Sequence, residues 1–172
     1  GGYKKRTDAA SGDSGDGRAF LTQPDRHNFQ TKEGSLKNIH TIRVLWTDCD
    51  PAGITFYGNY YRWMDEAAYY LFKAAGIRWE DWRSRFGALG IPLISAHADF
   101  SSPTRMGDEL TIESFVSEWG KSSFTITHRF MNGDQLAAEG YEKRVWCLGD
   151  PADPSTFASA PIPDEVRKPL GG

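Results

Sequence analysis

The sequence has few cysteines, no long apolar run and no metal-binding spacing. Cys49 and Cys147 are its only two cysteines, and they form no Cys-x-x-Cys pair, so neither a zinc site nor a disulfide framework is indicated. We expect reduced thiols, no metal and no cofactor. No run reaches the roughly 18 apolar residues of a membrane-spanning helix, and the first thirty residues lack the apolar middle of a secretory signal. These absences favour a cytoplasmic protein without a membrane partner.

An excess of charge of one sign is also missing. The formal net charge is −3, which gives no long-range field able to recruit nucleic acid, so we expect no nucleic-acid partner. Aromatic residues are plentiful instead, with 10 Phe, 7 Tyr and 6 Trp. A chain of 172 residues is long enough for one domain with a sizeable core, and rings supply much of its apolar surface.

Two polar ends flank the part that can form a core. Residues 1–37 mix Gly, Ser, Asp, Lys and Arg with few large apolar groups, and such a composition buries too little surface to offset the entropy of ordering. We predict a mobile N-terminal arm there. Five of the nine prolines fall from Gly149 onward, which predicts an irregular, Pro-rich C-terminal tail at 149–172. The folded domain is then expected at 38–148.

Hydrophobic periodicity predicts the first elements of that domain. Ile39–Trp46 alternates between apolar and polar residues, as a strand does. From Tyr60 to Ala75 apolar residues recur at spacings of three and four, which predicts a helix with Asn59 as its N-cap and Gly76 as its stop. A shorter helix or turn is expected at Trp79–Phe86.

Four β-like segments follow the helices. They are Ile91–Phe100, Glu109–Trp119, Ser122–Met131 and Gln135–Leu148. The Asn132-Gly133 pair between the last two is a strong hairpin signal. One strand, a long helix and then four strands in a row predict an α+β domain with an antiparallel sheet on one face of the helix.

The segment between the first strand and the long helix carries the most informative chemistry. It reads Thr47-Asp48-Cys49-Asp50-Pro51-Ala52-Gly53. Pro and Gly make it a turn, so Asp50 comes just before a helix whose first backbone N–H groups are unpaired. Those donors can hold an oxygen that develops negative charge, and the carboxylate can attack a thioester carbonyl or activate water. An aspartate in such a turn is also often only a turn former, so spacing alone leaves both roles open.

This segment and the start of the helix resemble a known family. The stretch Val44-x-x-Thr-Asp-Cys-Asp-Pro-Ala-Gly-Ile-x-Phe-Tyr-Gly-Asn-Tyr-Tyr-Arg-Trp-Met-Asp-Glu-Ala is similar to the 4-hydroxybenzoyl-CoA thioesterase family, in the branch that uses an aspartate of this loop. Thinner similarity continues through Gly90-Ile91-Pro92, Glu118-Trp119, Ser123-Phe124 and His128. The resemblance implies a hotdog fold, in which an antiparallel sheet wraps around one long helix. It also implies hydrolysis of an acyl-CoA thioester without a cofactor.

The resemblance implies a role for each of several residues. Asp50 is implied to be the nucleophile or general base, and Asp48 to be structural. The backbone N–H of Tyr57 is implied to polarise the thioester carbonyl. Asp65 is implied to face the acyl pocket, and Lys121 to contact a CoA phosphate. The resemblance also implies a homotetramer, a dimer of dimers, with the active site between subunits.

Two positions depart from the family member most similar to this chain. That member has Thr where this chain has Ile91 beside the acyl group, and three basic residues where this chain has Gly120, Lys121 and Ser122. We therefore predict that the substrate carries an aromatic, 4-hydroxybenzoyl-like or other apolar acyl group. We also expect fewer charged contacts to CoA.

Two other functions stay open at this point. One is a non-catalytic module that binds acyl-CoA or an acyl-carrier protein. The other is a hotdog hydratase, which needs an Asp and a His a few residues apart, but no His lies between Asp50 and Asp65. Glu66 is an alternative catalytic carboxylate, because another branch of hotdog thioesterases uses one on the helix. His128 lies on the apolar face of its strand and is predicted to be a core histidine.

Overall fold

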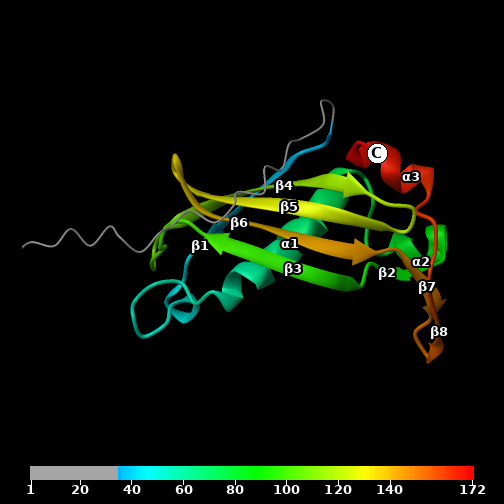
Figure 1. Cartoon of the computed structure of the whole chain (residues 1–172), viewed down its shortest axis with the longest axis horizontal. Helices are drawn as coiled ribbons and strands as arrows, with labels where there is room; N and C mark the ends of the chain where they lie inside the picture. Colours follow the sequence, from blue (N-terminus) through cyan, green and yellow to red (C-terminus); the bar gives the residue numbers. More distant parts are fainter. Residues whose placement is uncertain (1–34) are drawn as a thin grey trace, which may run out of the picture.

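The computed structural model describes residues 35–172, which form an antiparallel sheet wrapped around a long helix (Figure 1). The main sheet has five strands in the order β1-β4-β5-β6-β3. They are β1 (Asn38–Arg43), β4 (Glu109–Trp119), β5 (Ser123–Asn132), β6 (Gln135–Val145) and β3 (Leu93–Phe100). All neighbouring strands are antiparallel, and β5 and β6 form the hairpin predicted at Asn132-Gly133. The predicted α+β architecture is confirmed.

The long helix α1 (Gly58–Ala74) lies across one face of this sheet (Figure 1). Its apolar residues recur at helical spacing and form the buried side, which comprises Tyr60, Trp63, Met64, Ala67, Ala68, Leu71 and Phe72. Gly76 follows with a positive φ of 75° and ends the helix, as predicted. Asn59 is not the N-cap. It lies inside the first turn, where its Nδ2 donates to the carbonyl of Asp48 at 2.9 Å.

A second helix and a small sheet pack at the end of α1. The helix α2 (Asp81–Phe86) falls within the predicted Trp79–Phe86 segment. The small sheet has the order β2-β7-β8, with β2 (Ala88–Gly90), β7 (Cys147–Asp150) and β8 (Asp153–Ser159). The predicted strand Gln135–Leu148 is therefore divided between the two sheets, as β6 and the start of β7. Among the described residues, none of the helices has the length and apolarity needed to cross a bilayer.

The predicted first strand ends earlier than its alternation indicates. β1 stops at Arg43, and the turn η1 (Trp46–Asp48) follows, so Trp46 is 78% exposed rather than part of a buried face. After β1 the Val44 N–H donates to the Asp108 carbonyl at 2.9 Å, and the Val44 carbonyl accepts from the Gly107 N–H at 2.9 Å. Beyond that point the Asp48 carboxylate binds the backbone N–H of Leu45 and turns the chain.

One face of β5 is buried against the helix, and the other face is exposed to solvent only in part. Thr125 and Thr127 are 5% and 0% exposed, whereas Arg129 on the same face is exposed. The hydroxyl of Thr127 donates to Ser117 Oγ at 2.9 Å, and Ser117 Oγ donates to the Thr125 carbonyl at 3.3 Å. The Thr125 hydroxyl donates to Glu118 Oε2 at 3.3 Å, so each of the two threonine hydroxyls can be buried because it has a partner.

The prediction of an irregular tail at 149–172 is wrong. This segment contains β8, the helix α3 (Asp164–Arg167) and the turn η2 (Lys168–Leu170). Ile162, Val166 and Leu170 are buried in the same apolar cluster as the second half of α1. The prolines did not prevent this, because Pro163 is the N-cap of α3 and Pro169 lies in the first turn of η2, where no helical N–H is lost.

The predicted N-terminal arm, residues 1–37, lies mostly outside the described residues. Its last three residues are described and belong to the fold. Leu36 packs against the core, and Lys37 Nζ lies 3.1 Å from Glu113 Oε1. The folded part therefore begins before residue 38.

Candidate active site

The loop that carries Asp50 is fixed to the start of α1 by buried hydrogen bonds. The Thr55 N–H donates to the Thr104 carbonyl at 2.8 Å. Hydroxyl contacts continue from Thr55 to Thr104 at 2.6 Å and from Thr104 to Tyr60 at 2.9 Å. Burial raises the pKa of Tyr60, so its phenol stays protonated and keeps its place in this chain of hydroxyls. The loop is thus built on the helix and not left free.

The two aspartates of the loop have different surroundings. Asp48 is buried, and its Oδ2 accepts the Leu45 N–H at 2.8 Å while its Oδ1 accepts from Arg62 Nη2 at 2.9 Å. Asp50 is half-buried, and its Oδ1 accepts the Ala52 N–H at 2.8 Å. Its Oδ2 has no hydrogen-bond partner within residues 35–172. Both carboxylate oxygens of Asp48 are therefore used in holding the loop, whereas one carboxylate oxygen of Asp50 has no partner among the described residues.

A short hydrogen-bonded segment joins the Asp50 loop to the start of α1. A backbone bridge pairs Cys49 with Thr55, and the Asp50 N–H donates to the Ile54 carbonyl at 2.9 Å. Tyr57, two residues after Thr55, is the N-cap residue of α1, and its side chain makes no capping hydrogen bond. In the part of the chain that the structure describes, the Tyr57 N–H has no acceptor. An unpaired N–H at the positive end of a 17-residue helix is suited to hold a developing oxyanion.

A cavity of about 400 Å³ lies further along α1. Its lining is largely apolar and aromatic, and comprises Asp65, Ala68, Tyr69, Phe72, Ile77, Trp79, Trp82, Leu89, Gly90, Ile91, Pro92 and Arg144. Two predicted substrate-binding residues, Asp65 and Ile91, are therefore brought together in it. Asp50, Tyr57 and Lys121 are not part of its wall. Within one chain, the Asp50 loop is therefore not part of the cavity wall.

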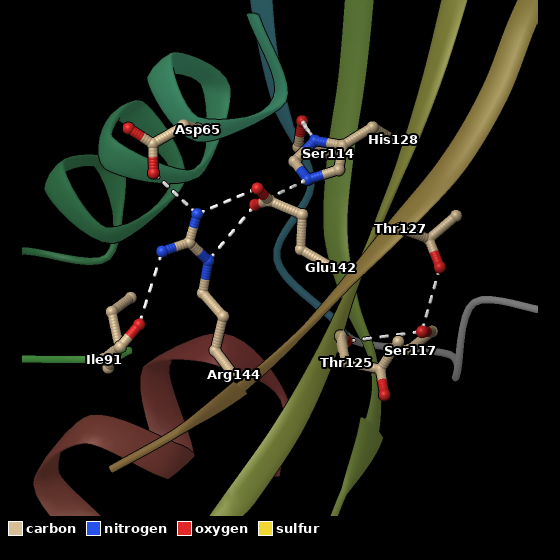
Figure 2. A network of polar contacts seen from close by, with 9 residues as sticks. All are labelled: Asp65, Ile91, Ser114, Ser117, Thr125, Thr127, His128, Glu142 and Arg144. Carbon is tan, nitrogen blue, oxygen red and sulfur yellow. Dashed lines mark hydrogen bonds and ion pairs between the residues drawn. The ribbon is translucent and has the colours of Figure 1, made fainter. Parts of the chain in front are cut away.

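The polar end of the cavity is a network that the sequence did not reveal (Figure 2). Arg144 Nη2 donates to Asp65 Oδ1 at 2.6 Å, and Arg144 Nη1 donates to the Ile91 carbonyl at 3.3 Å. Arg144 also binds both carboxylate oxygens of Glu142, from Nε at 3.2 Å and from Nη2 at 2.8 Å. The only signal in the sequence is that Glu142 and Arg144 alternate with exposed positions on a strand, so that both charges share its buried face.

His128 completes this network from inside the core, as predicted for a core histidine. It is fully buried, with Nδ1 2.8 Å from Ser114 Oγ and Nε2 3.5 Å from Glu142 Oε2. Burial lowers the pKa of His128, although Glu142 acts to raise it, so the ring is neutral near pH 7. A carboxylate only accepts, so we assign the proton to Nε2, which leaves Nδ1 to accept from Ser114. The Nε2 contact is longer than an ordinary hydrogen bond.

Glu66, the alternative carboxylate on the helix, is directed elsewhere. Its Oε1 lies 3.2 Å from His40 Nε2 on β1, and the His40 ring stacks on Tyr70 at 4.3 Å between centroids. Asp65 binds Arg144 on β6, which is separated from β1 by two strands. Of the two adjacent carboxylates, only Asp65 faces the cavity.

Lys121 lies far from Asp50 in one chain. The end of β1 pairs with the start of β4, through Arg43 and Glu109, and the loop of Asp50 follows from there. Lys121 is exposed in the turn after the other end of β4. β4 has 11 residues, which as a strand span roughly 35 Å. Figure 1 shows the loop before α1 and the β4–β5 turn at opposite ends of the sheet.

No three His, Cys, Asp or Glu side chains gather into a potential metal site anywhere in residues 35–172. Two groups in the described part of the chain are candidates for chemistry. These are the carboxylate of Asp50 with the start of α1, and the Asp65–Arg144 pair in the cavity.

The sequence matches known proteins over most of the folded part. Residues 44–170 match the model of the thioesterase-like superfamily. A 4-hydroxybenzoyl-CoA thioesterase from Pseudomonas sp. (strain CBS-3) is 36% identical over 114 residues, which cover 63% of this chain and 81% of that protein. A 1,4-dihydroxy-2-naphthoyl-CoA hydrolase from Trichodesmium erythraeum (strain IMS101) is 31% identical over 128 residues, which cover 73% of this chain and 88% of that protein.

Solved structures agree with these matches. A mutant 4-hydroxybenzoyl-CoA thioesterase complexed with 4-hydroxybenzoyl-CoA superposes with a TM-score of 0.72 at 28% identity, covering 78% of this chain and 99% of that one. A gentisyl-coenzyme A thioesterase superposes with a TM-score of 0.66 at 32% identity, covering 78% of this chain and 100% of that one. These similarities confirm the hotdog fold and the resemblance inferred from the loop sequence.

Proposed function

The chain belongs to the thioesterase-like superfamily, and we propose that it hydrolyses an aromatic acyl-CoA to the free acid and CoA, with Asp50 as nucleophile or general base. The relatives reported above are named for the hydrolysis of 4-hydroxybenzoyl, 1,4-dihydroxy-2-naphthoyl and gentisyl thioesters, all of which are aromatic. One observation carries the proposal. Among the described residues, one carboxylate oxygen of Asp50 has no partner, and its loop is hydrogen-bonded to the segment that leads into the start of α1, which has no side-chain cap.

Each step of thioester hydrolysis has a suitable group in this loop. The Tyr57 N–H, which is unpaired within the described residues, takes the carbonyl oxygen of the thioester. Asp50 Oδ2 either attacks the carbonyl carbon to form an anhydride or takes a proton from the water that attacks it. The C–S bond then breaks, and CoA leaves as a thiolate. In the first route, a water molecule hydrolyses the anhydride and restores the carboxylate.

The cavity suits the acyl group. Its volume of about 400 Å³ lies in the range of small-molecule pockets, and rings such as Tyr69 and Trp79 can pack against a planar acyl group. Ile91 adds an apolar surface, while Asp65 supplies one acceptor. This combination supports an aromatic acyl group over a long fatty chain.

The separation of the parts supports a site shared between copies of the chain. Asp50 is absent from the cavity wall, and Lys121 lies at the opposite end of the sheet from the Asp50 loop. In the described part of the chain β3 is an edge strand paired only with β6, and its Leu93 and Ile94 are 51% and 55% exposed. Such an edge favours pairing with another chain. We therefore propose a homotetramer built from dimers, in which the Lys121 of a second copy approaches CoA bound at Asp50.

A substrate panel tests the activity. The purified chain is mixed with 4-hydroxybenzoyl-CoA, benzoyl-CoA and fatty acyl-CoA of several lengths, and released CoA is followed with a thiol reagent. We expect release from the aroyl thioesters at a rate well above that from the fatty ones. No release from any thioester at high enzyme concentration, together with measurable binding, would identify a non-catalytic acyl-CoA or acyl-carrier-protein module instead.

A further inference from the structure

The turn between β4 and β5, residues 120–122, is held by residues from the C-terminal part of the chain. The Trp146 N–H donates to the Ser122 carbonyl at 2.7 Å, and the Ile162 N–H donates to the Lys121 carbonyl at 3.0 Å. Turns on the surface are usually among the more mobile parts of a domain, because few contacts hold their backbone. These two hydrogen bonds restrict the backbone of the β4–β5 turn.

Arg167 binds the third carbonyl of the β4–β5 turn. Its Nη2 donates to the Gly120 carbonyl at 2.6 Å, and its guanidinium lies over the Trp119 ring, 4.9 Å from the centroid. Arg167 is the last residue of α3, and Val166 before it and Leu170 after it are fully buried in the core. Figure 1 shows α3 at the end of the sheet where β4 ends. Arg167 therefore links the turn to a segment that is anchored in the apolar core.

The β4–β5 turn presents one free cation. Lys121 is exposed, and within residues 35–172 its ammonium has no carboxylate partner. The position before it has little room for a second cationic side chain. A Cβ added to Gly120 would lie 2.8 Å from Ser123 Oγ and 3.2 Å from the Ser123 carbonyl oxygen, so Ser123 would have to shift. A single Lys thus projects from a backbone in which every carbonyl is bound.

We propose that Arg167 is a positioning residue, which holds the β4–β5 turn so that Lys121 meets a phosphate group of CoA without first ordering its backbone. Ordering a mobile loop on binding costs free energy, and a preorganised loop avoids that cost. Arg167 acts through the Gly120 carbonyl and not on the substrate itself. The inference rests on the proposed function, in which Lys121 of a second copy approaches CoA, and it gives the C-terminal segment a part in substrate binding.

The test compares an aroyl-CoA with the corresponding aroyl-pantetheine, which has the same thioester but lacks the nucleotide and its phosphates. Arg167→Met keeps an apolar chain over Trp119 but has no donor for the Gly120 carbonyl. We expect it to raise KM for the aroyl-CoA by about 3- to 10-fold with kcat unchanged, as for the weakening of one hydrogen bond between charged groups. KM for the aroyl-pantetheine should stay within about 2-fold of the wild type, because this substrate has no phosphate for Lys121 to bind.

Arg85→Met is the matched control. The Arg85 guanidinium also lies 4.9 Å from a ring centroid, that of Phe86, but its Nη2 donates to Glu165 Oε2 at 3.0 Å and not to a carbonyl of the turn. The variant removes the same charge, so KM for both thioesters should keep the wild-type value. Arg167→Lys, which can still donate to a carbonyl, should restore most of the affinity for the aroyl-CoA.

A double variant separates positioning from direct binding. Lys121→Ala is expected to raise KM for the aroyl-CoA by about 10-fold or more, and adding Arg167→Met should change nothing further, because Arg167 acts only through Lys121. Additive losses would show that Arg167 binds the substrate itself and would overturn the inference. So would an unchanged KM in Lys121→Ala, an effect of Arg167→Met on both thioesters or on neither, or the same loss in Arg85→Met.

Calorimetry gives the same comparison without turnover. CoA and pantetheine are titrated into the wild type and each variant, and only the dissociation constant of CoA should rise in Lys121→Ala and Arg167→Met. A chain that shows this rise but hydrolyses no thioester would contradict the proposed function and keep this inference. A chain that hydrolyses the aroyl-CoA with the same KM in all variants would do the reverse.

Discussion

Asp48 and Asp50 stand two residues apart in one loop, and only one of them has a carboxylate oxygen without a partner in the described structure. Asp48 uses both oxygens to bind the Leu45 N–H and Arg62, whereas Asp50 uses Oδ1 to bind the Ala52 N–H. The first aspartate shapes the loop that presents the second. The two aspartates, close together in the sequence, therefore differ in whether both carboxylate oxygens have a hydrogen-bond partner.

Asp50→Asn is expected to lower kcat for an aroyl-CoA by more than about 100-fold, because the amide is neither a nucleophile nor a base. The amide oxygen still accepts the Ala52 N–H, so the melting temperature should stay unchanged. Asp150 offers a matched control, since its Oδ1 accepts the Ala152 N–H at 3.0 Å in the same type of turn. Asp150→Asn should leave kcat intact. Comparable loss in both variants would mean that Asp50 acts only as a turn former.

Arg144→Met alone is expected to destabilise the fold by about 3–5 kcal/mol, because it leaves Glu142 buried without its partner. The double variant Glu142→Leu with Arg144→Met should lie within about 1 kcal/mol of the wild type, since apolar groups can replace a buried pair. Urea unfolding at pH 7.5 measures both. A double variant as unstable as the single one would show that packing, and not the unpaired charge, sets the loss.

His128 is expected to make stability depend on pH. Burial lowers its pKa in the folded chain, so the unfolded chain binds the proton more readily. The stability that the neutral ring contributes is complete above the unfolded pKa of about 6.5 and is lost as the pH falls from there toward the folded pKa. Urea unfolding at pH 7.5, 6.5 and 5.5 should show this decline in the wild type. His128→Gln, which cannot titrate, should decline less, and parallel curves would contradict the assignment.

Leu170→Ala is expected to destabilise the chain by about 2–5 kcal/mol, as for other buried leucines, because Leu170 is fully buried in the core. Lys168→Ala, two residues earlier, is the control, since the Lys168 side chain is 74% exposed. Thermal unfolding of both variants gives the comparison. Equal small effects would mean that the C-terminal segment is not part of the cooperative core.

Hydrophobic periodicity in the sequence predicted the helices and strands whose buried residues recur at regular spacing. β4 agrees with the predicted Glu109–Trp119 at both ends, and α1 begins and ends within two residues of its predicted limits. The C-terminal helix was missed although Ile162, Val166 and Leu170 have helical spacing of four. The number of prolines in that segment suggested an irregular tail, but Pro163 and Pro169 lie at helix starts, where their missing N–H costs no helical hydrogen bond.

The candidate site was predictable only where it is local. The Asp50 loop lies within one short segment, so its sequence carried both the resemblance and the turn chemistry. The Asp65–Arg144 contact joins residues 79 positions apart, and no local pattern reports such a pair. The sequence indicated only that Glu142 and Arg144 share the buried face of β6. That Asp65 on α1 contacts Arg144 depends on how the sheet wraps around the helix.

The burial of Ile162, Val166 and Leu170 also has a consequence for synthesis. Chains are made from the N-terminus, and domains generally fold as units. The apolar cluster around Trp146 lacks three of its members until residue 170 has left the ribosome. A nascent chain that already contains the whole main sheet therefore still exposes part of its core until these three residues are added.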